Sequence, residues 1–405
     1  MFTNSIKIKR KYTERLLSHW YPGLQISYSY QYSKQKSKKA EMFSDFFTNV
    51  ITNIIWLFTI PTLVFLTFCN YLFIIFFKKR SWAETFAIKT PTASPKILAI
   101  GNLTLGGSGK TPTTICLVRN LLAQGIKPAV ISRGYKSEID SQNKKSQFVE
   151  IKSTNCSFRE FGDEPCLIAE TGVPVCVGNR LNSLKKINLE YPNTDLILLD
   201  DGLQQTEIQC DKKILVIDDR LLGNERLFPY GPLREKPPLK YNLDGVVLNS
   251  VSDQINCEVA FEKFKLDKKT PSSHLKLSSV TWKNIKNEEF DSEFIQKKID
   301  NNYRKFKIKP LAIAGIAFPD RFFKLLVKLG IDFEPLWLEN HDINFEKNLL
   351  DYLNFSQRIV LMTEKDGVRI IYSENDSKLN IDQIWILKLN LTIEPTFVKK
   401  ITDWI

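Results

Sequence analysis

The sequence predicts a doubly wound α/β protein with a second, smaller α/β lobe and an N-terminal membrane helix. Three observations lead to this fold class. Short apolar runs alternate with helical patterns, one run enters a glycine-rich turn at residues 106–110, and an uncharged stretch at residues 46–77 precedes them. Apolar runs that alternate with helices are typical of a parallel sheet covered by helices on both faces.

A basic arm, residues 1–42, comes first. It carries nine lysine and arginine residues against Glu14 and Glu41, and Met42 is the only methionine between Met1 and Met362. Two interpretations remain open. The arm is either dispensable, even upstream of the usual start of translation, or a clamp for anionic lipid.

The predicted membrane anchor is residues 43–80. Its densest part, Ile54 to Phe77, is long enough as a helix to cross a bilayer core, at a rise of about 1.5 Å per residue. Pro61 would kink such a helix, so a full crossing and a hairpin-like insertion both remain open. The cluster Lys78-Lys79-Arg80 then suits anionic headgroups.

The rest of the chain is predicted as a core at residues 95–250 and a second lobe at residues 305–405. A polar, lysine-rich segment, residues 251–304, connects them and carries little chemical signal. The predicted strands are Ile97–Ile100, Pro128–Ser132, Pro174–Val177, Leu196–Leu199, Ile214–Ile217, Leu311–Ala314, Arg358–Met362 and Ile384–Leu389. The predicted helices are Thr113–Gln124, Arg180–Leu189, Pro319–Leu329 and Asn344–Asn354.

A phosphate-binding loop between the first strand and the first helix makes the core P-loop NTPase-like. Glycines let backbone N–H groups curl round a polyphosphate at a helix N-terminus. Lys110 can reach the β- and γ-phosphates, and the Thr111 hydroxyl can hold Mg²⁺. The strict pattern opens with glycine, where this sequence has Thr104. A nucleoside triphosphate is the predicted ligand.

Three further polar motifs follow. An apolar run ends in Asp200-Asp201-Gly202, which suits Mg²⁺ beside a phosphate loop but is also an ordinary turn. The turn at residues 161–165 holds Asp163 and Glu164, which can equally be helix-capping residues. The proline-rich loop at residues 223–235 suits an anionic substrate or a metal site, and a plain surface loop fits it equally well.

Composition narrows the chemistry. Seven cysteines without a C-x-x-C pair predict reduced thiols, with neither a zinc site nor a disulfide framework. Three histidines make a histidine-rich metal site a poor fit. The net charge of +12 favours acidic partners such as nucleic acid, anionic lipid or a phosphorylated substrate, without choosing among them.

Taken together, the motifs resemble those of the tetraacyldisaccharide 4′-kinases, the lipid A 4′-kinases. The resemblance covers roughly residues 43–405, including the anchor. The motifs that carry it are Ile100–Pro112, Ser132–Tyr135, Gly162–Pro165, Asp200–Gln204, Gly231–Glu235 and Thr363–Asp366.

The resemblance implies transfer of the γ-phosphate of ATP, with Mg²⁺, to the 4′-hydroxyl of a tetraacyl glucosamine disaccharide 1-phosphate. The product is the 4′-phosphorylated lipid A precursor, lipid IVA. The implied location is the bacterial inner membrane, with the catalytic body on the cytoplasmic side and the acyl chains in the inner leaflet. Neither nucleic acid nor a protein partner is implied.

Site residues follow by position in these motifs. The implied catalytic residues are Asp163, His341 and Lys110, and the implied ATP-binding residues are Thr104, Leu105, Gly106, Gly107, Ser108, Gly109, Lys110 and Thr111. The implied metal residues are Thr111, Asp200, Asp201 and Glu235, and the implied substrate-binding residues are Arg133, Glu164 and Arg234. A histidine near Asp163 would orient the carboxylate or share its proton.

Four positions depart from the family pattern. The sequence has Gln205 for histidine, Cys210 for arginine, Lys136 for glycine and Asn340 for the aspartate before the histidine. None touches the nucleotide motif. The departures concern the sugar side of the predicted site.

Two other function classes are compatible with parts of the sequence. One is a membrane-tethered P-loop ATPase or GTPase that acts as a switch or motor on a partner. No guanine-specific N-K-x-D motif supports it, since residues 363–366 read Thr-Glu-Lys-Asp. The other is a nucleic-acid-binding protein that uses the basic arm, which lacks a recognisable reader motif.

Overall fold

A computed structural model describes residues 19–21, 95–135, 137–139, 146–149, 158–239, 241–249, 255–338, 357–371 and 383–405. All of them belong to one compact unit, made of residues 1–26 and 89–405. The predicted anchor (residues 43–80), the predicted helix at residues 344–354 and His341 lie outside the described residues. Within the ranges above, no helix is long and apolar enough to span a bilayer.

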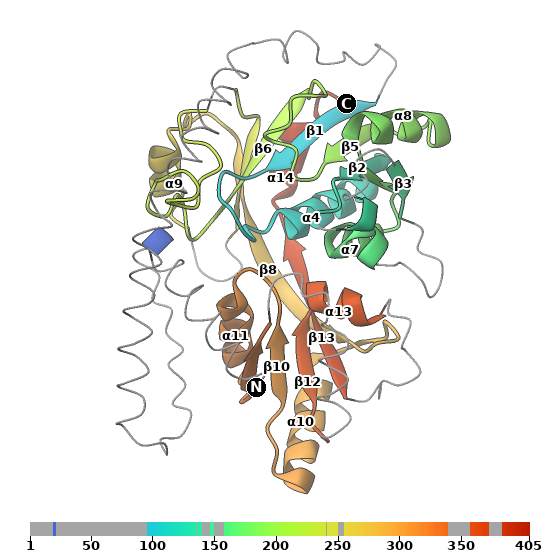
Figure 1. Ribbon diagram of the computed structural model, residues 1–405, viewed down its shortest axis with the longest axis vertical. Coiled ribbons are helices and arrows are strands. Elements are labelled where there is room, and N and C mark those ends of the chain that lie inside the picture. Colours follow the sequence, from blue (N-terminus) through green and yellow to red (C-terminus); the bar gives the residue numbers. More distant parts are fainter. Residues whose placement is uncertain are drawn as a thin grey trace, which may run out of the picture. The chain divides into compact units, whose positions relative to one another are not determined.

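The fold is mixed α/β and is built on one large, mostly parallel sheet (Figure 1). Its strand order is β11-β10-β12-β13-β8-β7-β6-β1-β5-β2-β4-β3. The first half contains β1 (Lys96–Gly101), β2 (Pro128–Ser132), β4 (Val175–Gly178), β5 (Leu196–Leu199), β6 (Lys212–Asp218) and β7 (Gly245–Asn249), all parallel, with β3 (Ser146–Phe148) antiparallel at the edge. The second half contains β10 (Leu311–Ala314), β11 (Glu334–Trp337), β12 (Val360–Thr363) and β13 (Ile384–Thr392).

One long strand, β8 (Ser272–Lys283), joins the two halves. Its first residues pair with β7 in parallel, and its last residues pair with β13 and with the short β9 (Glu289–Phe290) in antiparallel fashion. The connecting segment therefore contains the strand that makes the sheet continuous. Several of its residues are polar and exposed, so it lacks the unbroken apolar run that marks the other parallel strands.

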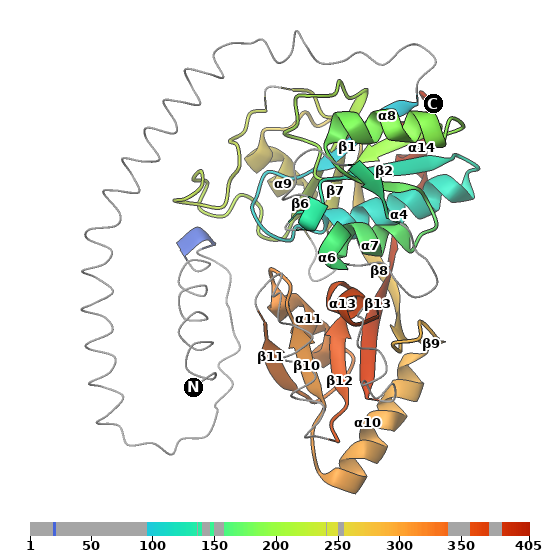
Figure 2. The same cartoon turned by 45° about the vertical axis from the view of Figure 1, so that its right-hand side comes forward.

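Helices cover both faces of the sheet (Figure 2). They are α4 (Lys110–Ala123), α6 (Phe158–Phe161), α7 (Asp163–Ala169), α8 (Arg180–Glu190), α9 (Cys257–Phe264), α10 (Ser292–Phe306), α11 (Pro319–Lys328), α13 (Glu364–Ile371) and α14 (Pro395–Thr402). One buried cluster contains side chains of α4, α7, α13 and α14, whereas α8 packs with Ile97 and Ile131 in a separate cluster. The larger cluster therefore draws on both halves of the chain.

The C-terminal helix α14 packs onto the first half of the sheet. Phe397 lies so close to Gly245 of β7 that a Cβ at this glycine would stand 2.9 Å from the ring. Beyond the helix, the Trp404 ring lies 5.2 Å from the Lys212 ammonium and 5.6 Å from that of Lys96. The last residues of the chain thus contact its first strand.

The predicted strands are present, most of them within two residues of the expected bounds. The first helix begins at Lys110 rather than Thr113, because Gly109, at a φ of 91°, ends the loop and caps the helix. The cysteine prediction holds for the free thiols of Cys116, Cys176, Cys210 and Cys257. Cys166 is instead disulfide-bonded, a state that residue spacing does not reveal.

Candidate active site

The phosphate loop connects β1 to α4. Gly106 and Gly109 have φ values of 88° and 91°, in the left-handed region that favours glycine. A Cβ at Gly109 would also stand only 2.1 Å from the Asn249 amide nitrogen. These two positions therefore need glycine for both conformation and space.

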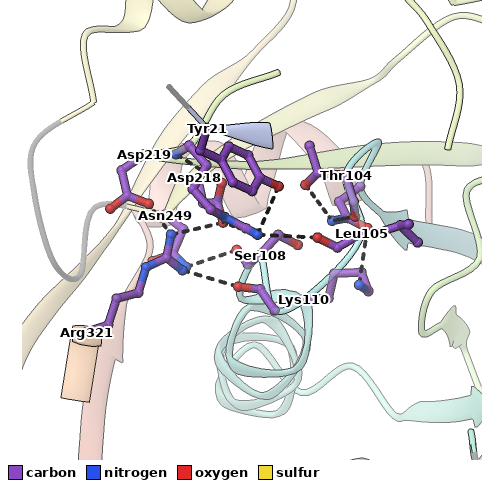
Figure 3. Close-up of polar contacts among 12 residues, drawn as sticks. Tyr21, Thr104, Leu105, Ser108, Lys110, Asp218, Asp219, Asn249 and Arg321 are labelled. Carbon is purple, nitrogen blue, oxygen red and sulfur yellow. Dashed lines mark hydrogen bonds and ion pairs between the residues drawn. The ribbon is translucent and has the colours of Figure 1, made fainter. Parts of the chain in front are cut away.

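Side-chain donors hold three carbonyl groups of this loop from outside (Figure 3). The pairs are Arg220 Nη1 with Leu105 O at 3.3 Å, Arg321 Nη1 with Gly107 O at 3.2 Å and Asn249 Nδ2 with Ser108 O at 3.0 Å. In a trans peptide the C=O and the following N–H point in opposite directions. The N–H groups of Gly106, Ser108 and Gly109 consequently point away from the three donors, as an anion-binding nest requires.

Two further observations at the loop indicate a ligand. The Ser108 hydroxyl is buried and has no hydrogen-bond partner among the described residues. Buried hydroxyls normally find a partner, so an orphan of this kind calls for an explanation. The loop also leads directly into the N-terminus of α4, where the helix dipole favours an anion. Both features suit a bound phosphate.

Lys110 lies between the loop and the end of β5. Its Nζ donates to Asn102 Oδ1 at 3.1 Å and lies 3.5 Å from Asp201 Oδ1. Thr111 follows in the first turn of α4 and is buried. The lysine therefore forms a charged link between the phosphate loop and the predicted metal-side pair.

The pKa values of Asp200 and Asp201 are shifted in opposite directions. Burial, followed by the nearby charges of Glu164 and Asp201, raises the pKa of Asp200 to about 7. Burial also acts to raise the pKa of Asp201, but Lys110 and Arg234 outweigh it and lower the pKa below its usual value. A carboxylate held ionised beside one that is readily protonated would favour a cation at this place, because a cation favours the charged form.

The loop that ends at Glu235 is fastened to the phosphate loop. Arg234 donates to both carboxylate oxygens of Asp201 at 2.8 Å each, and Leu105 N donates to the Pro232 carbonyl at 2.7 Å. Glu235 accepts hydrogen bonds from Gln204 (2.9 Å) and Tyr241 (2.6 Å). The contacts of Gln204 and Tyr241 with Glu235 could not be predicted, because Gln204 lies 31 residues before Glu235 and Tyr241 lies outside the motifs.

Asp163 and Glu164 open α7 and are held by α13. The buried Arg369 donates to Asp163 Oδ2 at 2.5 Å, and Lys365 donates to Glu164 Oε1 at 2.8 Å. Lys365 also lies 3.9 Å from Asp163 Oδ1. Burial acts to lower the pKa of Lys365, but Glu164 and Asp163 outweigh it and raise the pKa. The motif at residues 363–366 thus supports the predicted catalytic carboxylate, a role that its sequence alone did not indicate.

The structure brings most of the predicted site residues into one region of contacts. Asp201 forms ion pairs with both Lys110 and Arg234. Glu164 lies near enough to Asp200 to raise the pKa of Asp200. Arg133 is exposed just after β2. Burial chiefly lowers the pKa of Arg180, and the charge of Arg133 helps to lower it. The Arg180 guanidinium donates to Asp201 O at 2.8 Å. The predicted partner His341 lies outside the described residues.

Comparison with known proteins is consistent with the resemblance. Residues 62–405 match the family model for tetraacyldisaccharide-1-P 4′-kinase. The tetraacyldisaccharide 4′-kinase of Haemophilus influenzae is 34% identical over 293 residues, which cover 72% of this chain and 78% of the relative. That of Shewanella woodyi is 31% identical over 320 residues, covering 78% of this chain and 82% of the relative.

Among solved structures, the "apo" form of LpxK from Aquifex aeolicus in complex with ATP has a similar fold. Its TM-score is 0.60 at 24% identity, with 85% of this chain and 98% of that chain covered. The family match spans most of the chain and agrees with the motifs and their placement at the carboxyl ends of the strands. The chain therefore belongs to the tetraacyldisaccharide-1-P 4′-kinase family and is a kinase.

Proposed function

We propose that this protein transfers the γ-phosphate of ATP to the 4′-hydroxyl of a tetraacyl glucosamine disaccharide 1-phosphate, which gives lipid IVA. The family supports the substrate class. The observation that supports ATP as the phosphate donor is the phosphate loop, three of whose carbonyl groups accept hydrogen bonds from Arg220, Arg321 and Asn249. This loop and Lys110 would bind the triphosphate of ATP.

Mg²⁺ fits the donor set at the end of β5. Its residues would be Thr111, Asp200 and Asp201, with Glu235 as the further proposed member, and all offer the hard oxygen ligands that Mg²⁺ prefers. When bound, Mg²⁺ neutralises negative charge on the phosphates. Among the residues that the structure describes, no group of three or more His, Cys, Asp or Glu side chains forms a metal site.

The acceptor hydroxyl is activated, in this proposal, by Asp163. Its carboxylate takes the 4′-hydroxyl proton while the 4′-oxygen bonds to the γ-phosphorus and the bond to the ADP oxygen breaks. Arg369 and Lys365 hold Asp163 and Glu164 in place for this step. His341 remains a proposed partner of Asp163. Arg133, Glu164 and Arg234 are proposed to contact the disaccharide.

We further propose that residues 43–80 anchor the protein in the bacterial inner membrane, with the catalytic body on the cytoplasmic side. The uncharged stretch and the acyl chains of the substrate support this placement. Flotation with phospholipid vesicles tests it. The double variant Phe65→Glu, Ile75→Glu should fail to float, and flotation equal to that of the unaltered protein would contradict the anchor.

A product assay tests the reaction. The purified full chain is incubated with Mg·ATP and tetraacyl disaccharide 1-phosphate, and mass spectrometry measures gain of one phosphate. The expected product carries the new phosphate at the 4′ position. ATP hydrolysis without any phosphorylated lipid would contradict the proposal and favour the tethered-ATPase alternative.

A further inference from the structure

Trp20 and Tyr21 are buried against the core, although they precede the family match, which begins at residue 62. The Trp20 carbonyl accepts a hydrogen bond from Asn224 N at 2.5 Å, and the Asn224 amide donates to the His19 carbonyl at 3.2 Å. The Tyr21 ring packs edge-on against Phe318 at 6.1 Å between centroids. Backbone and side-chain contacts together fix this short segment in place.

The Tyr21 hydroxyl contacts the arginine that supports the phosphate loop. Arg220 Nη1 donates to Tyr21 Oη at 3.2 Å and to the Leu105 carbonyl at 3.3 Å (Figure 3). Burial raises the pKa of Tyr21 to about 12, against the opposing charge of Arg220, so the phenol stays protonated at neutral pH. One guanidinium nitrogen therefore bridges the N-terminal segment and the nucleotide loop.

The rest of the Arg220 side chain is held with little freedom. It is only 4% exposed, and its Nε donates to Asp218 Oδ2 at 2.7 Å. Its guanidinium lies 3.8 Å from the centroid of the Phe318 ring, where a cation is attracted to the aromatic face. Arg321 donates to the same Asp218 oxygen at 3.0 Å and also to the Gly107 carbonyl.

This layer touches the phosphate loop directly. A Cβ at Gly106 would stand 3.1 Å from Phe318 Cε2 and 3.4 Å from Arg220 Nη1. Tyr21 in turn contacts both Phe318 and Arg220, so it lies behind the layer that backs the loop. A shift of the Arg220 guanidinium would free the Leu105 carbonyl to rotate. The Gly106 N–H belongs to the same planar peptide, so its direction would change as well.

We infer that Tyr21 is a positioning residue of the nucleotide site, which holds Arg220 against the Leu105 carbonyl of the phosphate loop. The inference rests on the proposed ATP-binding role of that loop. It assigns residues 19–21 to the nucleotide-binding machinery, so the interpretation of residues 1–42 as a dispensable arm does not extend to them. Trp20 secures the segment through its backbone contact with Asn224 and its ring contact with Phe228, at 6.3 Å.

The test compares Tyr21→Phe with the unaltered full chain. This change keeps the ring and removes only the oxygen that accepts from Arg220. The matched control is Tyr303→Phe, since Tyr303 is exposed on α10. We expect the KM for ATP to rise about three- to tenfold with kcat and the lipid KM unchanged, on the scale of the net contribution of one typical hydrogen bond.

Two more measurements separate positioning from general stability. The melting temperature without nucleotide should match in all three proteins, whereas Mg·ATP should raise it less in Tyr21→Phe than in the other two. Tyr21→Ala should raise the KM for ATP further than Tyr21→Phe does. The inference is overturned if the KM for ATP of Tyr21→Phe stays within twofold of that of the unaltered protein. It is also overturned if the KM rises only together with a lower melting temperature in the absence of nucleotide. Failure of the unaltered protein to bind Mg·ATP would instead contradict the proposed function.

Discussion

At the scale of single residues, Lys110 contacts two side chains, Asn102 and Asp201. Its ammonium group offsets the charge of Asp201 and is bound by the Asn102 amide oxygen. Both partners lie beside the phosphate loop, so the lysine is held close to where the γ-phosphate is proposed to bind.

Lys110→Ala should therefore lower kcat by about two to three orders of magnitude, because the transferring phosphoryl group loses a fixed positive charge. Steady-state kinetics with Mg·ATP and the disaccharide lipid measures this loss. Lys127→Ala is the matched control, since Lys127 is exposed at the amino end of β2. Near-normal turnover of the Lys110 variant would rule out the nucleotide assignment.

Asp200 predicts a pH-dependent stability. Folding raises its pKa from 3.8 to about 7 through burial and the neighbouring carboxylates. The folded state then binds more protons than the unfolded state between about pH 4 and pH 7, so stability falls as pH rises through this window. Asp200→Asn removes this effect and should be inactive yet more stable by about 2–4 kcal/mol at pH 8.

Urea unfolding at pH 8 and pH 4 in a chelator tests this prediction. The advantage of Asp200→Asn should shrink to well under about 1 kcal/mol at pH 4, where Asp200 is protonated in the folded state and about half protonated in the unfolded state. Added Mg²⁺ should stabilise the unaltered protein at pH 8 and leave the variant unaffected. A variant that is less stable than the original at pH 8 would contradict the assigned direction of the pKa shift.

Only part of the candidate site could be predicted from the sequence at the level of single residues. Lys110, Thr111, Asp200 and Asp201 could be predicted because a strand, a turn and a helix start mark each of them locally. Arg220, Arg321, Arg369 and Tyr21 could not, because they reach the site only through tertiary packing and lie in no phosphate motif. His341 rests on resemblance alone.

At the scale of elements, α7 and α13 form one functional pair. The buried Arg369 of α13 contacts Asp163 of α7 and also lies 3.6 Å from the buried Asp366. Gly315 N and the Thr363 hydroxyl hold Asp366 from the other side. The position of the proposed base is therefore set by an element more than 200 residues away in sequence.

Arg369→Gln should lower kcat while the KM for ATP stays unchanged, because Asp163 is proposed to act on the acceptor hydroxyl and not on ATP. The double variant with Asp163→Asn should lose less than the sum of the two single effects, since the residues act as a unit. Arg358→Gln, which alters an ion pair with Glu334 in the second half, is the control. Fully additive losses would show that the two residues act independently.

Element prediction succeeded where burial is continuous and failed where it is not. β5 is buried at every residue, so its apolar run identifies it. β8 mixes four buried, five partly buried and three exposed residues and changes neighbours midway, so its sequence shows neither a buried apolar run nor a regular alternation. A strand of that kind cannot be predicted from a local sequence pattern.

At the scale of the whole molecule, the two predicted lobes share one sheet and one large buried cluster. The α/β class followed from the alternating pattern, whereas the strand order did not. Strand order depends on which distant segments pair, and a sequence without aligned relatives holds no record of those pairs. The pairing of β8 with β13 joins residues more than 100 positions apart.

The packing of α14 against β7, and of Trp404 beside Lys96 and Lys212, has a consequence during synthesis. α14 is translated after the described strands of the sheet, so the nascent first half of the sheet stays uncovered at Gly245 until α14 has been made. Chains that stop after Glu394 should be degraded rapidly in the cell. In the full chain, Phe397→Ala should lower the free energy of unfolding by about 3–5 kcal/mol. Pulse-chase labelling measures the half-lives of the truncated chain and of the chain that includes α14. Equal half-lives would contradict the expected role of α14. The first half of the sheet thus becomes fully covered only after α14 has been synthesised.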